Sequence, residues 1–180
     1  MLLIPDRMKT PLLRVVFALC AAGTVWAADS STAPKKAVVN FDHWEKFADV
    51  KDNYSPTERG QQEILQQISD YLVQDAGHVV PNGDLLTITF QDIHLAGEFE
   101  PWRGAQWDGI RVVKDIYPPH FKFTWALTNS GGTVVKQGQE DIVDLNFQMR
   151  ITAFRDDPLR YEKQILDEWM HRATWHLKTS

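Results

Sequence analysis

The sequence predicts an α+β fold in which a curved antiparallel sheet of four to five strands carries two helices packed on one face. Two segments place apolar residues at helical spacing, one after Ser55 and one after Asp157. Between them, residues 121–128 alternate between large apolar side chains and smaller or polar ones, which is typical of a strand with one buried face. The predicted order is therefore strand, helix, several antiparallel strands and helix.

The first elements are a short strand and a helix. Residues 37–41 are mostly apolar and predict the strand. Ser55 is placed to cap the helix, Pro56 suits its first position and Glu58 completes a capping box. Gly77 is the predicted end of the helix. The apolar stripe between them comprises Ile64, Leu65, Ile68, Tyr71 and Leu72.

The middle of the chain alternates strand and loop signals. Residues 85–95 are rich in apolar and β-branched side chains and predict a strand. Residues 96–109 contain three glycines and a proline, which predicts a loop. Residues 110–116 predict a further strand, which ends before two consecutive prolines.

The last strand and helix follow a turn at residues 129–132, where two glycines predict a hairpin. Residues 133–147 predict the returning strand, with a bulge at Gly138. Asp157 is placed to cap the final helix, and Pro158 to begin it. One side of this helix is apolar except for Glu162, and it comprises Leu159, Leu166, Trp169, Met170 and Ala173, widened by Ile165.

The amino terminus has the layout of a secretory signal peptide. Basic residues precede an apolar core at 15–22, and small side chains lead to a predicted cleavage after Ala27. The core is shorter than the ~20 residues of a spanning helix, which disfavours an uncleaved anchor. Met8 is a second candidate translation start. The predicted divisions are a signal peptide at 1–27, a flexible leader at 28–36, a single α+β domain at 37–175 and a tail at 176–180.

The one cysteine, Cys20, lies inside this signal. Lipidation there is an open alternative, although Leu19 stands where a small residue is expected. If Cys20 is removed with the signal, disulfides, thiol catalysis and cysteine metal sites are excluded together. Cleavage also removes three basic residues and one acidic residue, so the formal net charge changes from −5 to −7. An acidic chain is unsuited to nucleic acid, and we expect a periplasmic protein with no transmembrane segment after cleavage.

The loop at residues 97–109 has the composition of a binding surface. Tryptophan and arginine are the residue types that most often anchor interfaces, and loops often carry them. An alternative is that the two tryptophans fold back and cover an open edge of the core. The candidate binding residues are Glu98, Glu100, Trp102, Arg103, Trp107, Asp108 and the nearby Arg111.

A second candidate site comprises Asp92, His94 and Glu98. Asp92 and His94 are two residues apart on one predicted strand and therefore share a face. Imidazole and carboxylate ligands suit zinc or another divalent ion. No established ligand spacing is present, and solvated carboxylates are common in an acidic chain, so an ordinary surface cluster is the alternative.

Catalysis is not indicated, because the sequence has no serine nucleophile elbow and no phosphate-binding glycine loop. No cofactor is indicated either. Arg111 and Glu162 predict a buried or half-buried ion pair that pins the last helix to the sheet.

Two blocks of sequence resemble a known family. The first block contains Asp92–Ile93–His94–Leu95–Ala96–Gly97–Glu98, Glu100–Pro101–Trp102 and Ile110–Arg111–Val112–Val113. The second is Asp157–Pro158–Leu159–Arg160–Tyr161–Glu162–Lys163, with the later Trp169. These blocks resemble the uncharacterised bacterial exported proteins grouped as domain of unknown function 3016. The resemblance implies export through a signal peptide, but it implies no activity.

Three functional hypotheses follow. The first is a non-catalytic envelope protein that binds an envelope protein or a small ligand through the loop at 97–109. The second is a divalent-metal-dependent protein with ligands around Asp92, His94 and Glu98. The third is a structural envelope factor with no discrete site. The oligomeric state and the identity of any ligand do not follow from the sequence.

Overall fold

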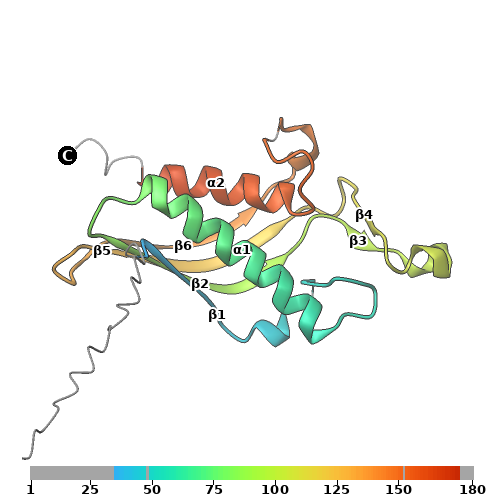
Figure 1. Ribbon diagram of the computed structural model, residues 1–180. Helices are drawn as coiled ribbons and strands as arrows, with labels where there is room; N and C mark the ends of the chain where they lie inside the picture. Colours follow the sequence, from blue (N-terminus) through green and yellow to red (C-terminus); the bar gives the residue numbers. More distant parts are fainter. Residues whose placement is uncertain (1–34, 48, 152, 175–180) are drawn as a thin grey trace, which may run out of the picture. The chain divides into compact units, whose positions relative to one another are not determined.

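The computed structural model describes residues 35–47, 49–151 and 153–174. Its main layer is a four-stranded sheet in the order β1-β2-β5-β6, and helices α1 and α2 lie across one face of it (Figure 1). The α+β class and the position of both helices are confirmed. The elements are β1 (Ala37–Phe41), α1 (Glu58–Val79), β2 (Leu85–His94), β5 (His120–Thr128), β6 (Val134–Val143) and α2 (Arg160–Thr174).

Shorter elements connect these. Among the described residues, a separate two-stranded sheet and four short 3-10 helices lie between the main elements. They are η1 (Trp44–Lys46), β3 (Glu98–Phe99), η2 (Pro101–Arg103), η3 (Ala105–Trp107), β4 (Arg111–Val112) and η4 (Phe147–Met149). The predicted signal peptide, most of the predicted leader and the predicted tail fall outside the described residues.

The sheet is mixed, whereas the sequence had predicted a wholly antiparallel one. Strands β2, β5 and β6 pair antiparallel in chain order, but β1 pairs with β2 in parallel. The reason is the connection, because α1 carries the chain back so that β2 runs in the direction of β1. The alternation predicted for residues 121–128 is confirmed, since every second residue of β5 is buried.

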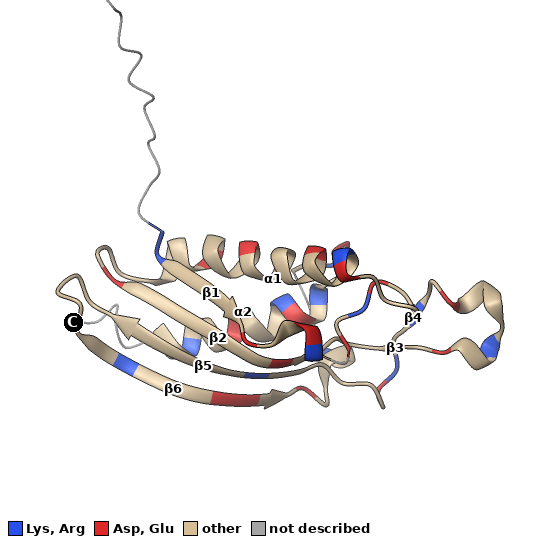
Figure 2. Ribbon diagram, turned by 90° about the horizontal axis from the view of Figure 1, so that it is seen from below, with Lys and Arg blue, Asp and Glu red and all other residues tan. Residues whose placement is uncertain are grey.

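The core fills the space between the helices and the sheet. Trp169 of α2 is 1% exposed, and its ring packs edge-on against Phe123 of β5, with centroids 4.6 Å apart. Leu72 of α1 and Phe90 of β2 are fully buried in the same cluster. Most charged residues are exposed or half-buried, as on α1 and β6 (Figure 2), but Asp49, Glu100, Asp144 and Glu162 are buried. No helix among the described residues has the length and hydropathy needed to cross a bilayer.

Helix α1 begins and ends two residues later than the sequence had predicted. Thr57, not Ser55, is the cap, and its hydroxyl accepts a hydrogen bond from the Gly60 N–H at 2.9 Å. Asp52 fixes Thr57 by accepting from both its N–H and its hydroxyl. The helix passes Gly77 and ends at Val79, because Val79 and Val80 are buried in the core and hold the last turn in place.

Gly138 is not a bulge, which corrects the prediction for β6. The register shift lies at Val135, since Leu127 pairs with Lys136 and Thr128 pairs with Val134. Gly138 instead lies opposite Trp125, and a Cβ added there would lie 2.8 Å from the indole Nε1. The glycine therefore makes room for the tryptophan ring. Strand β6 also ends at Val143, earlier than predicted, and Phe147 lies in η4.

Candidate functional site

The segment from Gly97 to Tyr117, here called the arm, extends beyond the end of the main sheet. A hydrogen bond from the Gly97 N–H to the Tyr117 carbonyl closes its base at 3.0 Å. Strands β3 and β4 form its stem, and the chain between them lies furthest from the sheet (Figure 1). The sequence had predicted a loop followed by a strand over 110–116. Only Arg111 and Val112 pair, because their partner strand β3 has only two residues.

Glu100 holds the arm together from inside. Its side chain is fully buried, and it accepts hydrogen bonds from Lys114 and, at 3.2 Å, from the Tyr117 hydroxyl. Arg103 also pairs with it. The Lys114 hydrogen bond, supported by the others, holds the pKa of Glu100 below its ordinary value, against the opposing effect of desolvation. Glu100 is therefore an organising residue of the arm and does not face a ligand.

Apolar residues are exposed on the arm. Trp102 is 70% exposed, whereas Trp107 is half-buried and lies under the Arg103 guanidinium, 5.3 Å from its ring centroid. Both tryptophans were candidate binding residues, but they differ in exposure. Of the two, only Trp102 is free to contact a partner. Three further apolar side chains of the arm are exposed, which the sequence did not single out: Ile110, Val113 and Ile116.

Arg111 fixes the base of the arm to the loop between η1 and α1, which contains Asp49. Its guanidinium donates to the Gly97 carbonyl at 2.8 Å and to the Asp49 carbonyl at 3.1 Å, and it pairs with the Asp49 carboxylate at 3.4 Å. It also lies 4.8 Å from the centroid of the Phe99 ring. Burial raises the pKa of Asp49 above its ordinary value, although Arg111 opposes the shift. The described contacts of Arg111 are internal, which assigns it a structural role.

Glu162 of α2 is buried, as is the stripe around it, but it does not pair with Arg111. Its Oε1 accepts a hydrogen bond from the Ala96 N–H at 2.7 Å, and its Oε2 has no hydrogen-bond partner among the described residues. Burial raises the pKa of Glu162. The predicted ion pair between Arg111 and Glu162 is therefore wrong, because Arg111 pairs with Asp49 and Glu162 binds the Ala96 N–H. Glu162 still ties the helix to the end of β2, through a backbone amide in place of a guanidinium.

A cavity of about 340 Å³ lies where these groups meet. Arg111 and Glu162 both line it, together with Phe99 of β3 and the first turns of α1. The two motif blocks, which are some sixty residues apart in the sequence (Ala96 and Glu162 are separated by 66 positions), converge at this cavity. The two blocks therefore meet at the junction between the arm, the sheet and α2.

The predicted metal residues separate into two groups. Asp92 and His94 lie together with His120 of β5, and ligand atoms of the three lie within 4.8 Å of one another. Glu98 is outside this group, and its carboxylate accepts from the N–H of Phe99. The sequence did not indicate His120, because its position opposite His94 depends on the strand pairing.

Asp108, another candidate binding residue of the arm, has a structural contact through its backbone. Its carbonyl accepts a hydrogen bond from the Tyr54 N–H at 3.1 Å.

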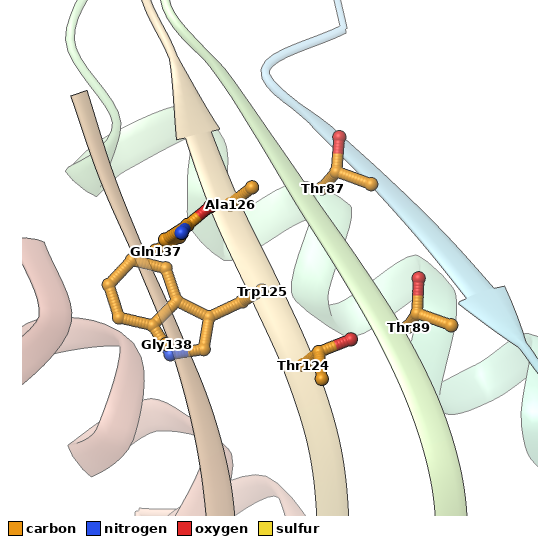
Figure 3. Close-up of a pocket in the computed structure, with 7 residues that line it drawn as sticks. All are labelled: Thr87, Thr89, Thr124, Trp125, Ala126, Gln137 and Gly138. Carbon is orange, nitrogen blue, oxygen red and sulfur yellow. The ribbon is translucent and has the colours of Figure 1, made fainter. Parts of the chain in front are cut away.

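The uncovered face of the sheet forms a shallow hollow (Figure 3). Its rim carries the hydroxyls of Thr87, Thr89 and Thr124 and the amide of Gln137. Trp125 and Gly138 also line the hollow, but the Trp125 indole lies on the helix-covered side of the sheet, where its ring centroid is 5.9 Å from that of Trp169 and its Nε1 donates to Glu140 at 3.0 Å. The lining residues offer hydrogen bonds but no ionisable side chain, so this hollow contains no acid–base pair.

Comparison with known proteins gives a family and no activity. Residues 35–172 match the family model described as "Protein of unknown function (DUF3016)". No curated protein and no solved structure matches the chain. The matched range contains both motif blocks, the arm and the cavity at its base, and it confirms the resemblance drawn from the sequence. Because the match covers well over half of the 180 residues, the chain belongs to the DUF3016 family.

Proposed function

We propose that this chain is an exported, non-catalytic envelope protein that binds a partner protein through its arm. The observation that carries the proposal is Trp102, a tryptophan 70% exposed on a segment that is fixed from inside by a buried, multiply bonded glutamate. An exposed tryptophan on a rigid support loses little conformational entropy when it is buried by a partner. Tryptophan is also the residue type most enriched among interface hot spots.

The exposed apolar residues of the arm and the charge of the chain favour a protein partner. Ile110, Val113 and Ile116 add exposed apolar area to the arm that carries Trp102, and exposed apolar area is typical of protein interfaces. The chain has a formal net charge of −5, which disfavours nucleic acid and anionic lipid. These properties favour a partner protein whose surface has an apolar site for the Trp102 indole.

The test is capture of an envelope partner by tagged protein after crosslinking. We expect Trp102→Ala to lower the yield of that partner at least about 10-fold, as loss of a hot spot costing 1.4 kcal/mol or more would. The matched control is Met149→Ala, since Met149 is 87% exposed and lies outside the arm. Ile116→Ser, a second arm variant, should weaken capture in the same direction. Equal capture by wild type and both arm variants would refute the proposal.

Export is the second part of the proposal, and the layout of residues 1–27 supports it. We expect the mature protein in the periplasmic fraction to begin at Ala28, as read by mass spectrometry of its amino-terminal peptide. A protein that keeps residues 1–27 in the membrane fraction would indicate an anchor instead. An acylated Cys20 at the amino terminus would indicate a lipoprotein.

A further inference from the structure

We propose that Asp92, His94 and His120 form a binding site for a divalent transition-metal ion of the zinc type. This site lies outside the arm and is independent of the proposed partner binding. All three side chains are on the sheet face that the helices leave uncovered. They come from two neighbouring strands, and His94 pairs directly with His120 in the β2–β5 register.

A bulge in β2 places the residues on that face. The register between β2 and β5 shifts between Phe90 and Asp92, so that Gln91 has no partner. Because side chains alternate along a strand, a single extra residue reverses which positions face out. Without the shift, Asp92 and His94 would continue the buried series of Phe90. With it, both join His120 on the open side, and Ile93 is buried in their place.

The distances suit one shared ion after small side-chain rotations. One ligand atom from each residue lies within 4.8 Å of the others, and the two imidazole rings are 5.5 Å apart between centroids. The Asp92 carboxylate already lies 2.9 Å from the His94 Nε2. Ligand bonds of about 2.0–2.2 Å to zinc need ligand atoms somewhat closer than 4.8 Å, a change that rotamers of half-exposed side chains allow.

The chemistry of the donors selects the ion. Two imidazoles and one carboxylate favour zinc and its neighbours in the first transition series. Magnesium and calcium prefer sites made of oxygen ligands and would be bound weakly. The side chains of His94 and Asp92 are 40% and 34% exposed, so water can complete the coordination and the ion has a path to the site.

The carboxylate of Asp141 supports the proposed ligand His120 without being a ligand itself. Asp141 of β6 lies 2.7 Å from the Nε2 of His120. A carboxylate behind a metal-bound imidazole orients the ring and strengthens it as a ligand. Lys122 opposes binding, because it is the registered neighbour of both Asp92 and Asp141. Its positive charge would repel a cation, and its removal should therefore strengthen binding.

The described residues contain a competing group, which the experiment must separate. Asp75, Asp167 and His171 lie together on the two helices. This group has one imidazole and two carboxylates, and therefore fits zinc less well than the sheet site. His171→Ala is thus the matched control for His120→Ala, since each variant removes one histidine from one candidate group.

The test is calorimetric titration of the purified, chelator-treated protein with ZnCl2, MgCl2 and CaCl2. We expect one equivalent of zinc at the sheet site, at least about 100-fold weaker binding in His94→Ala and His120→Ala, and roughly 10-fold weaker binding in Asp141→Asn. Lys122→Gln should bind more tightly, and His171→Ala should bind as wild type does. Melting temperatures measured without metal confirm that each variant folds.

Three results would overturn the proposal. The first is the absence of zinc binding by folded wild-type protein. The second is unchanged affinity in His120→Ala. The third is loss of the zinc equivalent in His171→Ala with retention in His120→Ala, which would place the ion on the helices.

Discussion

Replacing Trp169 with alanine is expected to lower the free energy of unfolding by about 3–5 kcal/mol, the range for a large aromatic residue removed from a packed core. Trp169 is 1% exposed and contacts the rings of Phe123 and Trp125 from above the sheet. Its loss opens a cavity at the contact between α2 and β5. Urea denaturation followed by circular dichroism measures the change.

Trp102 provides the matched control for this prediction. It is the same residue type but is 70% exposed, so Trp102→Ala should change the free energy of unfolding by no more than about 0.5 kcal/mol. The conservative variant Trp169→Phe should cost less than Trp169→Ala, because it keeps a ring and removes an indole N–H that has no partner among the described residues. Similar losses for Trp102→Ala and Trp169→Ala would contradict the assigned burial.

Replacing Arg111 with methionine is expected to cost about 3–5 kcal/mol near neutral pH, the cost of leaving a buried charge without its partner. The change removes the cation from Asp49 and the donor from the Gly97 carbonyl. It also leaves Glu162 without the nearby positive charge that opposes its pKa shift. Chemical denaturation at several pH values measures the loss.

The pH dependence of this loss has a definite sign. Burial holds the pKa of Asp49 and of Glu162 above their ordinary values, and Arg111 opposes both shifts. Without Arg111 both pKa values rise further. A carboxyl with a raised pKa in the folded state favours folding below its unfolded pKa, and this contribution is lost as the pH rises through the folded pKa. The penalty of Arg111→Met should therefore be smallest near pH 4 and grow toward pH 7.

Arg59 provides the control for Arg111. Its side chain is 88% exposed and forms a surface pair with Glu63 on the next turn of α1. Arg59→Met should change the free energy of unfolding by less than about 1 kcal/mol, with little dependence on pH. Equal effects of the two substitutions would show that the buried network around Arg111 does not contribute to stability.

The periodic elements of the fold could be predicted from local pattern. The alternation in β5 and the apolar stripes of α1 and α2 depend only on neighbours in the sequence. The parallel pairing of β1 could not, because it depends on the path of the chain through α1. The cap is Thr57 and not the predicted Ser55 for a similar reason, because Asp52, which lies outside the helix, accepts two hydrogen bonds from Thr57.

The candidate sites depended on contacts between distant residues. The exposed tryptophan and the Asp92–His94 pair could be proposed from composition and alternation. His120 could not, because it meets His94 only through the register of β2 and β5. Arg111 was assigned the wrong partner because residues 43–53 carry no periodic signal, and Asp49 lies within them. The difference between Trp102 and Trp107 depends on the Arg103 side chain that covers one of them.

The central claim is that the arm is a binding surface with Trp102 at its contact, and site-specific photo-crosslinking tests it most directly. A photoreactive amino acid replaces one exposed residue at a time in the intact protein, at position 105 or 106 on the arm, where Trp102 stays in place, and at position 149 outside it. We predict one discrete adduct with the same partner from positions 105 and 106, which Trp102→Ala removes, and none from position 149. Adducts from position 149 alone, or equal adducts from all three positions, would contradict the claim.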